Sequence, residues 1–396
     1  MKKAFSVAGT RIVGTIAQGL TFLVLTQSLG PVSFGSFATI MVTFTFVSAL
    51  VGFGSGSLAL RVQSSSRPAS LAASVSLLRY ITITVAALSV LLISIYVFNI
   101  RDAPLLIAGI LFGLLEASYR AVENILFGLE KTKRAQISMV FRRVTVLASV
   151  ILGSIWGVSL EFLSATVSLL ILSSPFWLLR LLDKPLNLTA TIKLSLPYWG
   201  ADILARLQTL DVAIATLAVN PVGAGVYAAA SRVSSPLNIL ASSVLSVLTP
   251  QLSREKGATR LETSNRSMRF LLIVCAGLIA ISPAVGFLLE WVLGTEYAGV
   301  ALPAALLCVA AGVAAINQGQ VAFLYASSEA RRLFWTRLFV IPPAMLSGIP
   351  LGLSLGAVGI ALAVVLSQLL QVIFLRWQVL RIKSQQHARI SNTSSY

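Results

Sequence analysis

The chain has 396 residues, of which 57% are hydrophobic and only 11% are charged, and its mean hydropathy is +0.89. This composition excludes a soluble domain and predicts a membrane protein. The formal net charge of +17 would suggest nucleic acid as the partner of a soluble protein, but here the positions of the basic residues argue against that partner. Outside the predicted spans, the basic residues lie at the N-terminus, in every second loop and in the C-terminal tail, with Arg101 as the exception.

Apolar segments long enough to cross a bilayer, for which about 20 residues are needed, recur along the whole chain. Because they are continuously apolar and do not alternate, they predict helices rather than a barrel. The alternation of basic and uncharged loops predicts that both termini are cytoplasmic and that the basic loops contact anionic membrane lipids. We expect an all-α, polytopic protein with twelve spans, at 10–29, 34–60, 71–98, 104–129, 137–157, 159–182, 193–218, 222–251, 267–293, 298–326, 334–355 and 356–380.

An internal repeat divides the chain. The pattern x-Pro-Val-x-x-Gly-x-aromatic-Ala occurs at 30–38 and again at 220–228, an offset of 190 residues from Pro31 to Pro221. Each copy follows the first span of its half, on the outer side, so the pattern predicts two parallel six-helix repeats. The predicted parts are an N-terminal lobe at 1–182, a cytoplasmic linker at 183–192, a C-terminal lobe at 193–381 and a polar cytoplasmic tail at 382–396.

The seventh predicted span contains three ionisable residues. Asp202 and Arg206 are four residues apart and share a helix face, with the acid on the N-terminal side, which is the better order for an ion pair. A charge near the middle of a span is costly, so Arg206 is expected to face protein or a wet cavity. The pair is therefore either a structural ion pair or part of the wall of a polar path. Asp211 is on a different face and needs another partner.

The fourth predicted span contains Glu116, Arg120 and Glu123 on one helix face. Two interpretations remain open for this acid–base–acid series. It is either an internally neutralised group that holds helices together, or a relay for protons or cations and a cavity wall. Glycines at 52, 54 and 56, near the inner end of the second span, are expected to loosen that helix.

Further cationic or hydrogen-bonding groups lie in the first and eighth spans. Arg11 and Gln18 are seven residues apart on one face of the first span, and Arg232 lies in the eighth. If the first and seventh helices are repeat mates, Arg11 and Arg206 face a common cavity. The planar fork of arginine binds phosphate through two hydrogen bonds, so such a cavity favours an anionic, phosphorylated solute. The alternative for Arg11 is that it extends to the lipid headgroups.

No cofactor or metal site is predicted. Both cysteines, Cys275 and Cys308, lie inside predicted spans, and the single histidine, His387, lies in the tail. These positions support neither a disulfide framework nor a Cys/His metal site. The absence of a P-loop pattern argues against an ATP-driven transporter subunit.

Four segments resemble the O-antigen and polysaccharide flippases (Wzx type) of the multidrug/oligosaccharidyl-lipid/polysaccharide superfamily. Residues 29–37 (LGPVSFGSF) resemble the turn after the first helix of these flippases, and residues 52–61 (GFGSGSLALR) the end of the second helix. Residues 221–232 (PVGAGVYAAASR) are similar to the start of the eighth helix, and residues 250–253 (PQLS) to its close. The resemblance covers nearly the whole chain.

The resemblance implies a V-shaped pair of six-helix lobes that alternate access in a bacterial-type cytoplasmic (inner) membrane. It also implies transfer of a polyprenyl-diphosphate-linked oligosaccharide (an O-antigen, capsule or exopolysaccharide repeat unit) to the outer leaflet, coupled to H⁺ or Na⁺. Glycan polymerases or glycosyltransferases are the implied protein partners. The implied diphosphate or cavity contacts are Arg11, Gln18, Arg206 and Arg232, and the candidates for ion coupling or structural ion pairs are Glu116, Arg120, Glu123, Asp202 and Asp211.

Two other classes of membrane protein fit the sequence less well. A multidrug antiporter of the related MATE branch typically has a carboxylate in its first helix for cation coupling, where this chain offers only Arg11. A membrane glycosyltransferase or polymerase needs catalytic acids on an outer loop or domain. The predicted outer loops contain only isolated acids, so no enzyme is predicted. These acids are Asp102, Glu161, Glu290 and Glu296.

Overall fold

The computed structural model describes residues 2–59, 62, 65–178, 181–232, 237, 252, 257–327 and 329–393. Within these residues the chain is helical and contains no strand. Nine of the described helical segments are long and apolar enough to cross a membrane. The main helices are α1 (Lys2–Leu50), α2 (Ser55–Ala59), α3 (Pro68–Tyr96), α4 (Ala103–Gly128), α5 (Thr132–Ile155), α6 (Ser159–Ser173), α7 (Leu188–Leu207), α8 (Asp211–Ala218), α10 (Gly257–Leu293), α11 (Ala301–Ala326), α12 (Ala330–Leu355) and α13 (Ala357–Thr393).

The first two predicted spans are joined in α1 and separated by a break at Gly30. This residue has φ 69° and ψ 170°, far from helical values, and Pro31 follows it. Glycine accepts a positive φ without steric cost, and proline starts the next helical segment because its missing N–H is not needed there. The break therefore lies where the sequence places the first outer turn.

The second predicted span does not continue to residue 60. Its helix ends at Leu50, and a turn over 51–54 leads into the short α2. Phe53 and Gly54 have positive φ values of 48° and 74°. The Trp199 indole of α7 donates a 2.8 Å hydrogen bond to the carbonyl oxygen of Leu50 and so caps the end of α1. The predicted loosening by the glycines at 52–56 is thus a complete break of the helix.

The seventh predicted span is also broken, which corrects the expectation of one continuous helix over 193–218. It consists of α7, a 3-10 turn η3 (Gln208–Leu210) and α8. Arg206 lies in the last turn of α7 and Asp211 in the first turn of α8. Both charges suit the local helix dipole, which favours cations at a C-terminus and anions at an N-terminus. Asp211 also accepts a 2.9 Å hydrogen bond from the N–H of Val212.

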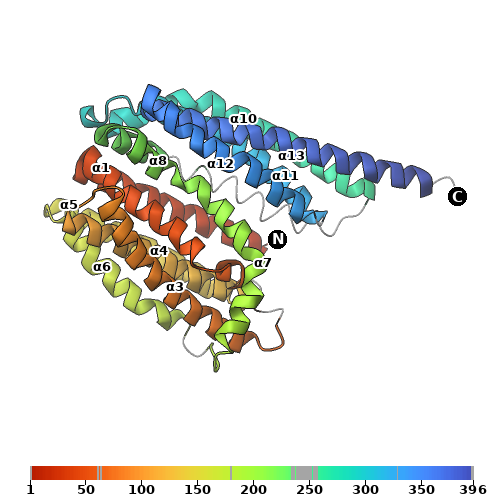
Figure 1. Cartoon of the computed structure of the whole chain (residues 1–396), viewed down its shortest axis with the longest axis horizontal. Coiled ribbons are helices and arrows are strands. Elements are labelled where there is room, and N and C mark those ends of the chain that lie inside the picture. Colours follow the sequence, from red (N-terminus) through yellow and green to blue (C-terminus); the bar gives the residue numbers. More distant parts are fainter. Residues whose placement is uncertain are drawn as a thin grey trace. The chain divides into compact units, whose positions relative to one another are not determined.

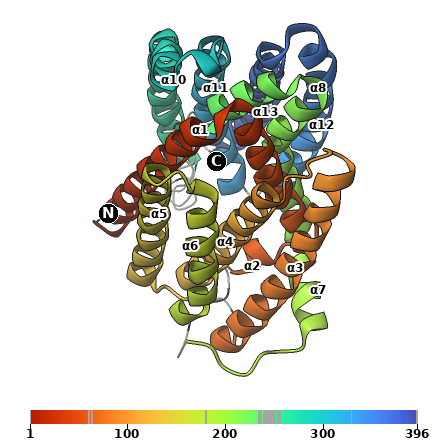
Figure 2. The ribbon, with the colours of Figure 1, turned by 90° about the vertical axis from the view of Figure 1, so that its left-hand side faces the viewer.

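The contacts divide the chain into two compact units, Met1–Ala229 and Ala230–Tyr396. In the first unit α4 packs against α1, α3, α5 and α6, and α7 and α8 pack against α1 (Figures 1 and 2). In the second unit α11 packs against α10 and α13, and α13 packs against α12 (Figure 1). The lobe boundary at 183–192, which rests on the sequence repeat, stays a prediction.

The two copies of the repeated turn touch at equivalent positions within the first unit. A Cβ atom added to Gly35 would lie 2.9 Å from the Cα of Gly225, which is 190 residues further along the chain. A Cβ on Gly225 would overlap the carbonyl oxygen of Pro31. Contact between equivalent residues is the geometry expected when a rotation axis relates two parallel repeats. Only glycine allows the two backbones to approach this closely.

Candidate functional site

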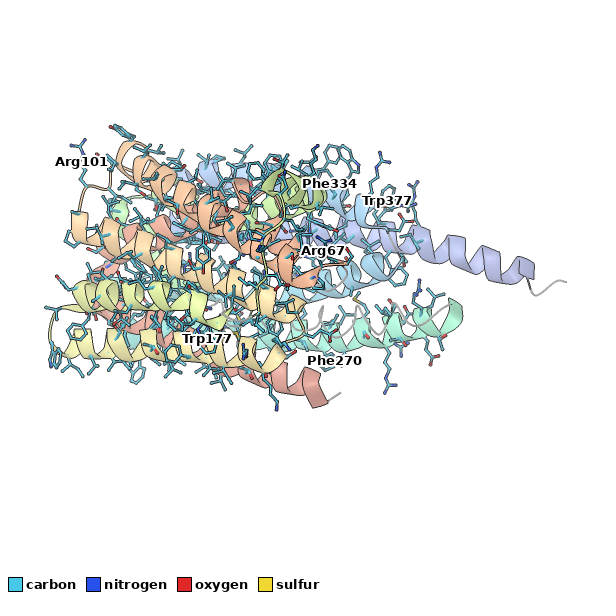
Figure 3. All side chains as sticks on the ribbon, turned by 90° about the horizontal axis from the view of Figure 1, so that it is seen from below. Arg67, Arg101, Trp177, Phe270, Phe334 and Trp377 are labelled. Atoms are coloured by element: carbon cyan, nitrogen blue, oxygen red, sulfur yellow. The ribbon has the colours of Figure 1, made fainter. Side chains whose placement is uncertain are left out.

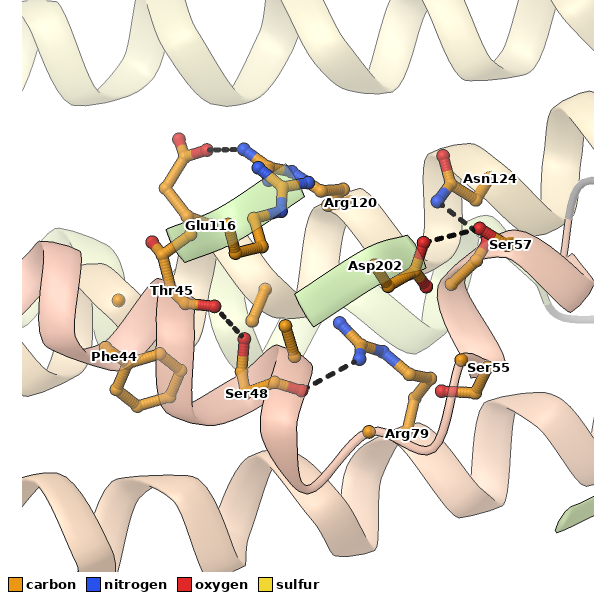
Figure 4. A pocket seen from close by; sticks show the side chains of 17 residues that line it. Phe44, Thr45, Ser48, Ser55, Ser57, Arg79, Glu116, Arg120, Asn124 and Asp202 are labelled. Atoms are coloured by element: carbon orange, nitrogen blue, oxygen red, sulfur yellow. Dashed lines mark hydrogen bonds and ion pairs between the residues drawn. The ribbon is translucent and has the colours of Figure 1, made fainter. Parts of the chain in front are cut away.

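A cavity of about 310 Å³ lies inside the first unit, where α1 and α7 are broken (Figure 4). Its walls come from the end of α1, the 51–54 turn, α2, α3, α4 and α7. Most of its lining residues are small, polar or charged: Phe44, Thr45, Ser48, Ala49, Gly52, Gly54, Ser55, Gly56, Ser57, Arg79, Gly113, Glu116, Ala117, Arg120, Asn124, Asp202 and Arg206. The cavity therefore brings together four predicted site residues: Glu116, Arg120, Asp202 and Arg206.

Three arginines from three different helices line this cavity. Arg79 of α3 is buried, and its Nη1 donates a 3.4 Å hydrogen bond to the carbonyl oxygen of Ser48. Its Nε has no hydrogen-bond partner in the part of the chain that the structure describes. The side chain of Arg120 is 41% exposed and lies 3.9 Å from Glu116. The charge of Arg206 is repelled by those of Arg120 and Arg79 and attracted by those of Asp202 and Glu116.

Asp202 forms no direct ion pair with Arg206. Its Oδ1 accepts a 2.7 Å hydrogen bond from the hydroxyl of Ser57 in α2. No ion pair within 4.0 Å joins Asp202 to Arg206, and Arg206 has none with any other described residue. A direct ion pair, one of the two alternatives that their spacing left open, is thus not formed between these two residues, and both line the cavity. The lining has three arginines and two carboxylates, Asp202 and Glu116, and Glu116 is also paired with Arg142. An excess of positive charge remains in a membrane-embedded helix bundle, so a bound anion would stabilise this arrangement.

Glu116 and Glu123 are held together by a residue that the sequence analysis missed. Arg142 of α5 lies 2.8 Å from Glu116 and 3.2 Å from Glu123, and its side chain is only 3% exposed. The guanidinium also lies 5.5 Å from the centre of the Tyr119 ring. The central cation of the expected acid–base–acid series is thus Arg142 rather than Arg120. This pairing fits the structural interpretation, since two buried carboxylates share one buried cation.

The sequence did contain a signal for the missed arginines. Arg79 and Arg142 lie inside predicted spans, at 71–98 and 137–157, where each ionisable residue is costly and needs a partner. A third such residue, Arg143, donates a 3.3 Å hydrogen bond to the hydroxyl of Thr15. Applying the rule used for Arg206 to every span would have found all three. The sequence does not show which helices these arginines connect, because the spacing of residues along one helix does not specify which other helices pack against it.

Asp211 and Gln18, two other predicted site residues, are not among the residues that line this cavity. Asp211 accepts a 2.6 Å hydrogen bond from the Tyr227 hydroxyl, which supplies the separate partner that its helix face required. Gln18 is half-buried on α1 and does not line the cavity. The side chain of Arg11 lies outside the described residues, and Arg232 belongs to the second unit.

The glycines of the lining make room for the arginines and for helix packing. A Cβ on Gly52 would lie 2.7 Å from Nη1 of Arg79, so a larger residue would displace that guanidinium. A Cβ on Gly113 would lie 2.5 Å from the ring of Phe44, where α4 packs on α1. A Cβ on Gly54 would overlap the carbonyl oxygen of Ser195 in α7. Among the described residues no group of three or more His, Cys, Asp or Glu residues could hold a metal ion.

Comparison with models of known protein families shows which family the chain belongs to. Residues 1–256 match the model described as "Polysaccharide biosynthesis protein". The chain belongs to this family. The match extends over more than half of the sequence and includes all lining residues of the cavity. A search of curated proteins gave no significant match.

Solved structures similar to this polysaccharide biosynthesis family member share its fold at low identity. An inward-facing MATE-family multidrug resistance transporter of the MOP superfamily has 15% identity and a TM-score of 0.65, with 98% of each chain covered. The lipid II flippase MurJ in an inward closed conformation has 18% identity and a TM-score of 0.71, with 95% of this chain and 87% of that chain covered. A MOP-superfamily transporter from Pyrococcus furiosus has 16% identity and a TM-score of 0.65, with 98% and 96% covered. The chain therefore has a MOP-type fold, which is the fold of membrane flippases and transporters.

Proposed function

We propose that this protein is a flippase that moves a polyprenyl-diphosphate-linked oligosaccharide from the cytoplasmic to the outer leaflet by alternating access. The glycan would be an O-antigen, capsule or exopolysaccharide repeat unit, and the membrane a bacterial-type cytoplasmic membrane with both termini inside. The observation that carries the proposal is the cluster of Arg79, Arg120 and Arg206 in one membrane-embedded cavity. Family membership and the flippase among the similar folds support it.

A diphosphate is the part of such a substrate that the cavity fits. Arginine stays charged, and its planar fork binds phosphate oxygens through two parallel hydrogen bonds. Lodging a dianionic group among Arg79, Arg120 and Arg206 would relieve the repulsion between them. The volume of about 310 Å³ is at the small end of ligand sites. The cavity would therefore hold the diphosphate, while the glycan and the polyprenyl chain extend beyond it.

Asp202 is the favoured residue for ion coupling. It lines the cavity, and its hydrogen-bond partner is the neutral hydroxyl of Ser57 rather than a cation. It can therefore take up H⁺ or bind Na⁺ without breaking an ion pair. Glu116 and Glu123 are both paired with the buried Arg142, so taking up an ion at either one would break one of the ion pairs of this buried cluster. We accordingly assign those two residues a structural role and Asp202 the coupling role.

The alternative, a cation-coupled multidrug antiporter of the MATE type, fits the cavity less well. Arginines outnumber carboxylates in the lining by three to two, so a cationic drug would be repelled by the excess positive charge. An enzymatic role has less support, because the structures of similar fold include a transporter and a flippase.

Deletion of the gene followed by analysis of lipid-linked intermediates tests the proposal. If the protein is a flippase, the deletion should cause the polyprenyl-linked oligosaccharide to accumulate on the cytoplasmic side. The wild-type gene should relieve this accumulation, whereas a variant with Arg79, Arg120 and Arg206 all changed to glutamine should not. Sensitivity to cationic drugs without such accumulation would support the antiporter and refute the flippase.

A further inference from the structure

A second hollow lies in the second unit, between α12 and α13, and has a volume of about 470 Å³. Three of its lining residues on α12 are Arg332, Trp335 and Phe339, and three on α13 are Phe374, Trp377 and Arg381. In each helix they follow the spacing i, i+3, i+7, so each set forms one stripe on its helix. We call this hollow the α12–α13 groove. The function proposed above makes no use of it.

The two stripes present the same chemistry at the same depth. The helices are consecutive and packed together, with the turn at Gly356 between them. Arg332 lies in the first turn of α12 and Arg381 in the later part of α13, so both arginines are at the end away from that turn. From this end inward, each helix shows an arginine, then a tryptophan, then a phenylalanine. Figure 3 shows Phe334 and Trp377 toward this end of the helix pair. Seven residues of helix set the length of the groove at about 10 Å.

The aromatic rings of the groove are exposed yet fixed in position. Phe339 is 69% exposed, Trp335 44% and Trp377 49%. The rings of Trp335 and Phe339 are stacked with centroids 5.8 Å apart, and the Arg381 guanidinium lies 4.2 Å from the centre of the Trp377 ring. Tryptophan beside arginine is typical of the membrane interface, where one end of the site is wet and the other apolar.

This end of the unit carries a strong excess of positive charge. From residue 329 to the end of the sequence there are seven basic residues and one acidic residue, Glu329. Glu329 lies 3.0 Å from Nε of Arg332. A guanidinium has five N–H donors, so this ion pair occupies one edge of Arg332 and leaves donors for a second anion. The charge of the groove therefore complements an anionic headgroup.

We propose that the α12–α13 groove binds an anionic phospholipid. Its phosphate lies between Arg332 and Arg381, and the first part of an acyl chain lies along the rings of Trp335, Trp377, Phe339 and Phe374. The rest of the chain continues into the bilayer, because the groove is only about 10 Å long. By the positive-inside rule this lipid belongs to the cytoplasmic leaflet. Basic pockets between membrane helices on that side are suited to anionic lipids.

Tryptophan fluorescence in nanodiscs tests the site with the full-length protein. The nanodiscs contain phosphatidylcholine and an increasing fraction of phosphatidylglycerol with brominated chains, which quench nearby tryptophans. The test variant is R332Q/R381Q. The matched control is R331Q/R376Q, which removes the same charge from exposed positions of the same two helices that do not line the groove. A W335F/W377F variant identifies the quenched residues among the six tryptophans.

We expect saturable quenching of the wild type that is lost in W335F/W377F. In R332Q/R381Q the phosphate loses its hydrogen bonds to two charged groups. Since each such bond contributes binding free energy, we expect the half-saturating fraction of phosphatidylglycerol to rise at least about tenfold. In R331Q/R376Q we expect clearly less change. An equal loss in both double variants would mean general surface attraction and would overturn the proposal. So would equal quenching by brominated phosphatidylcholine, or displacement by polyprenyl phosphate but not by unlabelled phosphatidylglycerol. None of these outcomes depends on whether the protein is a flippase.

Discussion

Replacing Arg142 with methionine tests whether the Glu116–Arg142–Glu123 cluster is structural. Methionine keeps much of the length of the side chain and removes its charge. Arg142 is the partner of both carboxylates, at 2.8 and 3.2 Å, and all three side chains are buried or nearly so. Removing one member of a buried ion pair costs about 3–5 kcal/mol, because the remaining charge is uncompensated. Here two carboxylates lose their cation, so we expect destabilisation at the upper end of this range.

The geometry also predicts which second substitution restores stability. Glu116 keeps Arg120 at 3.9 Å after Arg142 is removed, whereas Glu123 has no other ion-pair partner among the described residues. Adding Glu123→Gln to Arg142→Met should therefore recover more stability than adding Glu116→Gln. The triple variant, with no charge left in the cluster, should recover the most.

The assay is thermal unfolding of the purified protein in detergent, followed by tryptophan fluorescence and by the fraction that remains monodisperse. A matched control is Arg101→Met, an exposed arginine in a loop, which should leave the melting temperature unchanged. If Arg142→Met melts like the wild type, or if Glu116→Gln rescues it better than Glu123→Gln, then the assignment of Arg142 as the shared cation is refuted.

Three further predictions concern the cavity and the repeat contact. Arg206→Ala should lower flipping in reconstituted vesicles at least about tenfold, the value of one charged hydrogen bond, while membrane insertion stays normal; unchanged transport would contradict its role. Asp202→Asn should abolish the dependence of transport on pH or sodium, which initial rates at varied ion gradients measure; a retained dependence would remove Asp202 as the coupling residue. Gly225→Ala should cost about 1–3 kcal/mol through overlap with the carbonyl of Pro31 and lower the melting temperature, whereas Gly277→Ala, with open space around it, should not. Equal melting temperatures for the two glycine variants would contradict the close backbone contact.

Much of the fold could be predicted from composition and pattern. Continuous apolar segments indicated membrane helices, and the repeated Pro-Val-x-x-Gly turn indicated two parallel repeats. That turn also contained the two glycines that meet in the structure, although the sequence did not show that Gly35 and Gly225 contact each other. The turn at 51–54 is itself apolar, so hydropathy joined α1 to α2. The break between α7 and α8 falls on polar residues (Gln208, Thr209 and Asp211), but the apolar segments on both sides still form one span-length segment.

The sequence predicted several residues of the candidate site but not which side chains bind one another. Arg206, Asp202, Glu116 and Arg120 were found because a charge inside a span is conspicuous. Their partners were sought at i+4 on the same helix, since that is the only neighbour a sequence specifies. The structure instead joins Asp202 to Ser57 of α2, and Glu116 to Arg142 of α5. Such partners depend on which helices pack together, which local spacing cannot give.

The two helix breaks explain why the cavity lies where it does. Backbone that is not helical is tolerated at membrane depth only where it is buried in protein or lines a cavity. The 51–54 turn lines the cavity, and η3 begins two residues after Arg206, at the end of the α7 segment that contributes to the cavity wall. The break after Arg206 ends α7 there, so the positive charge lies at the negative end of a helix dipole. Asp211, on the far side of the same break, is held by Tyr227 from the second copy of the repeat. The break thus separates Arg206, which lines the cavity, from Asp211, which binds Tyr227 of the second repeat copy. A straight helix over 193–218 would have neither of the two helix ends whose dipoles stabilise these charges.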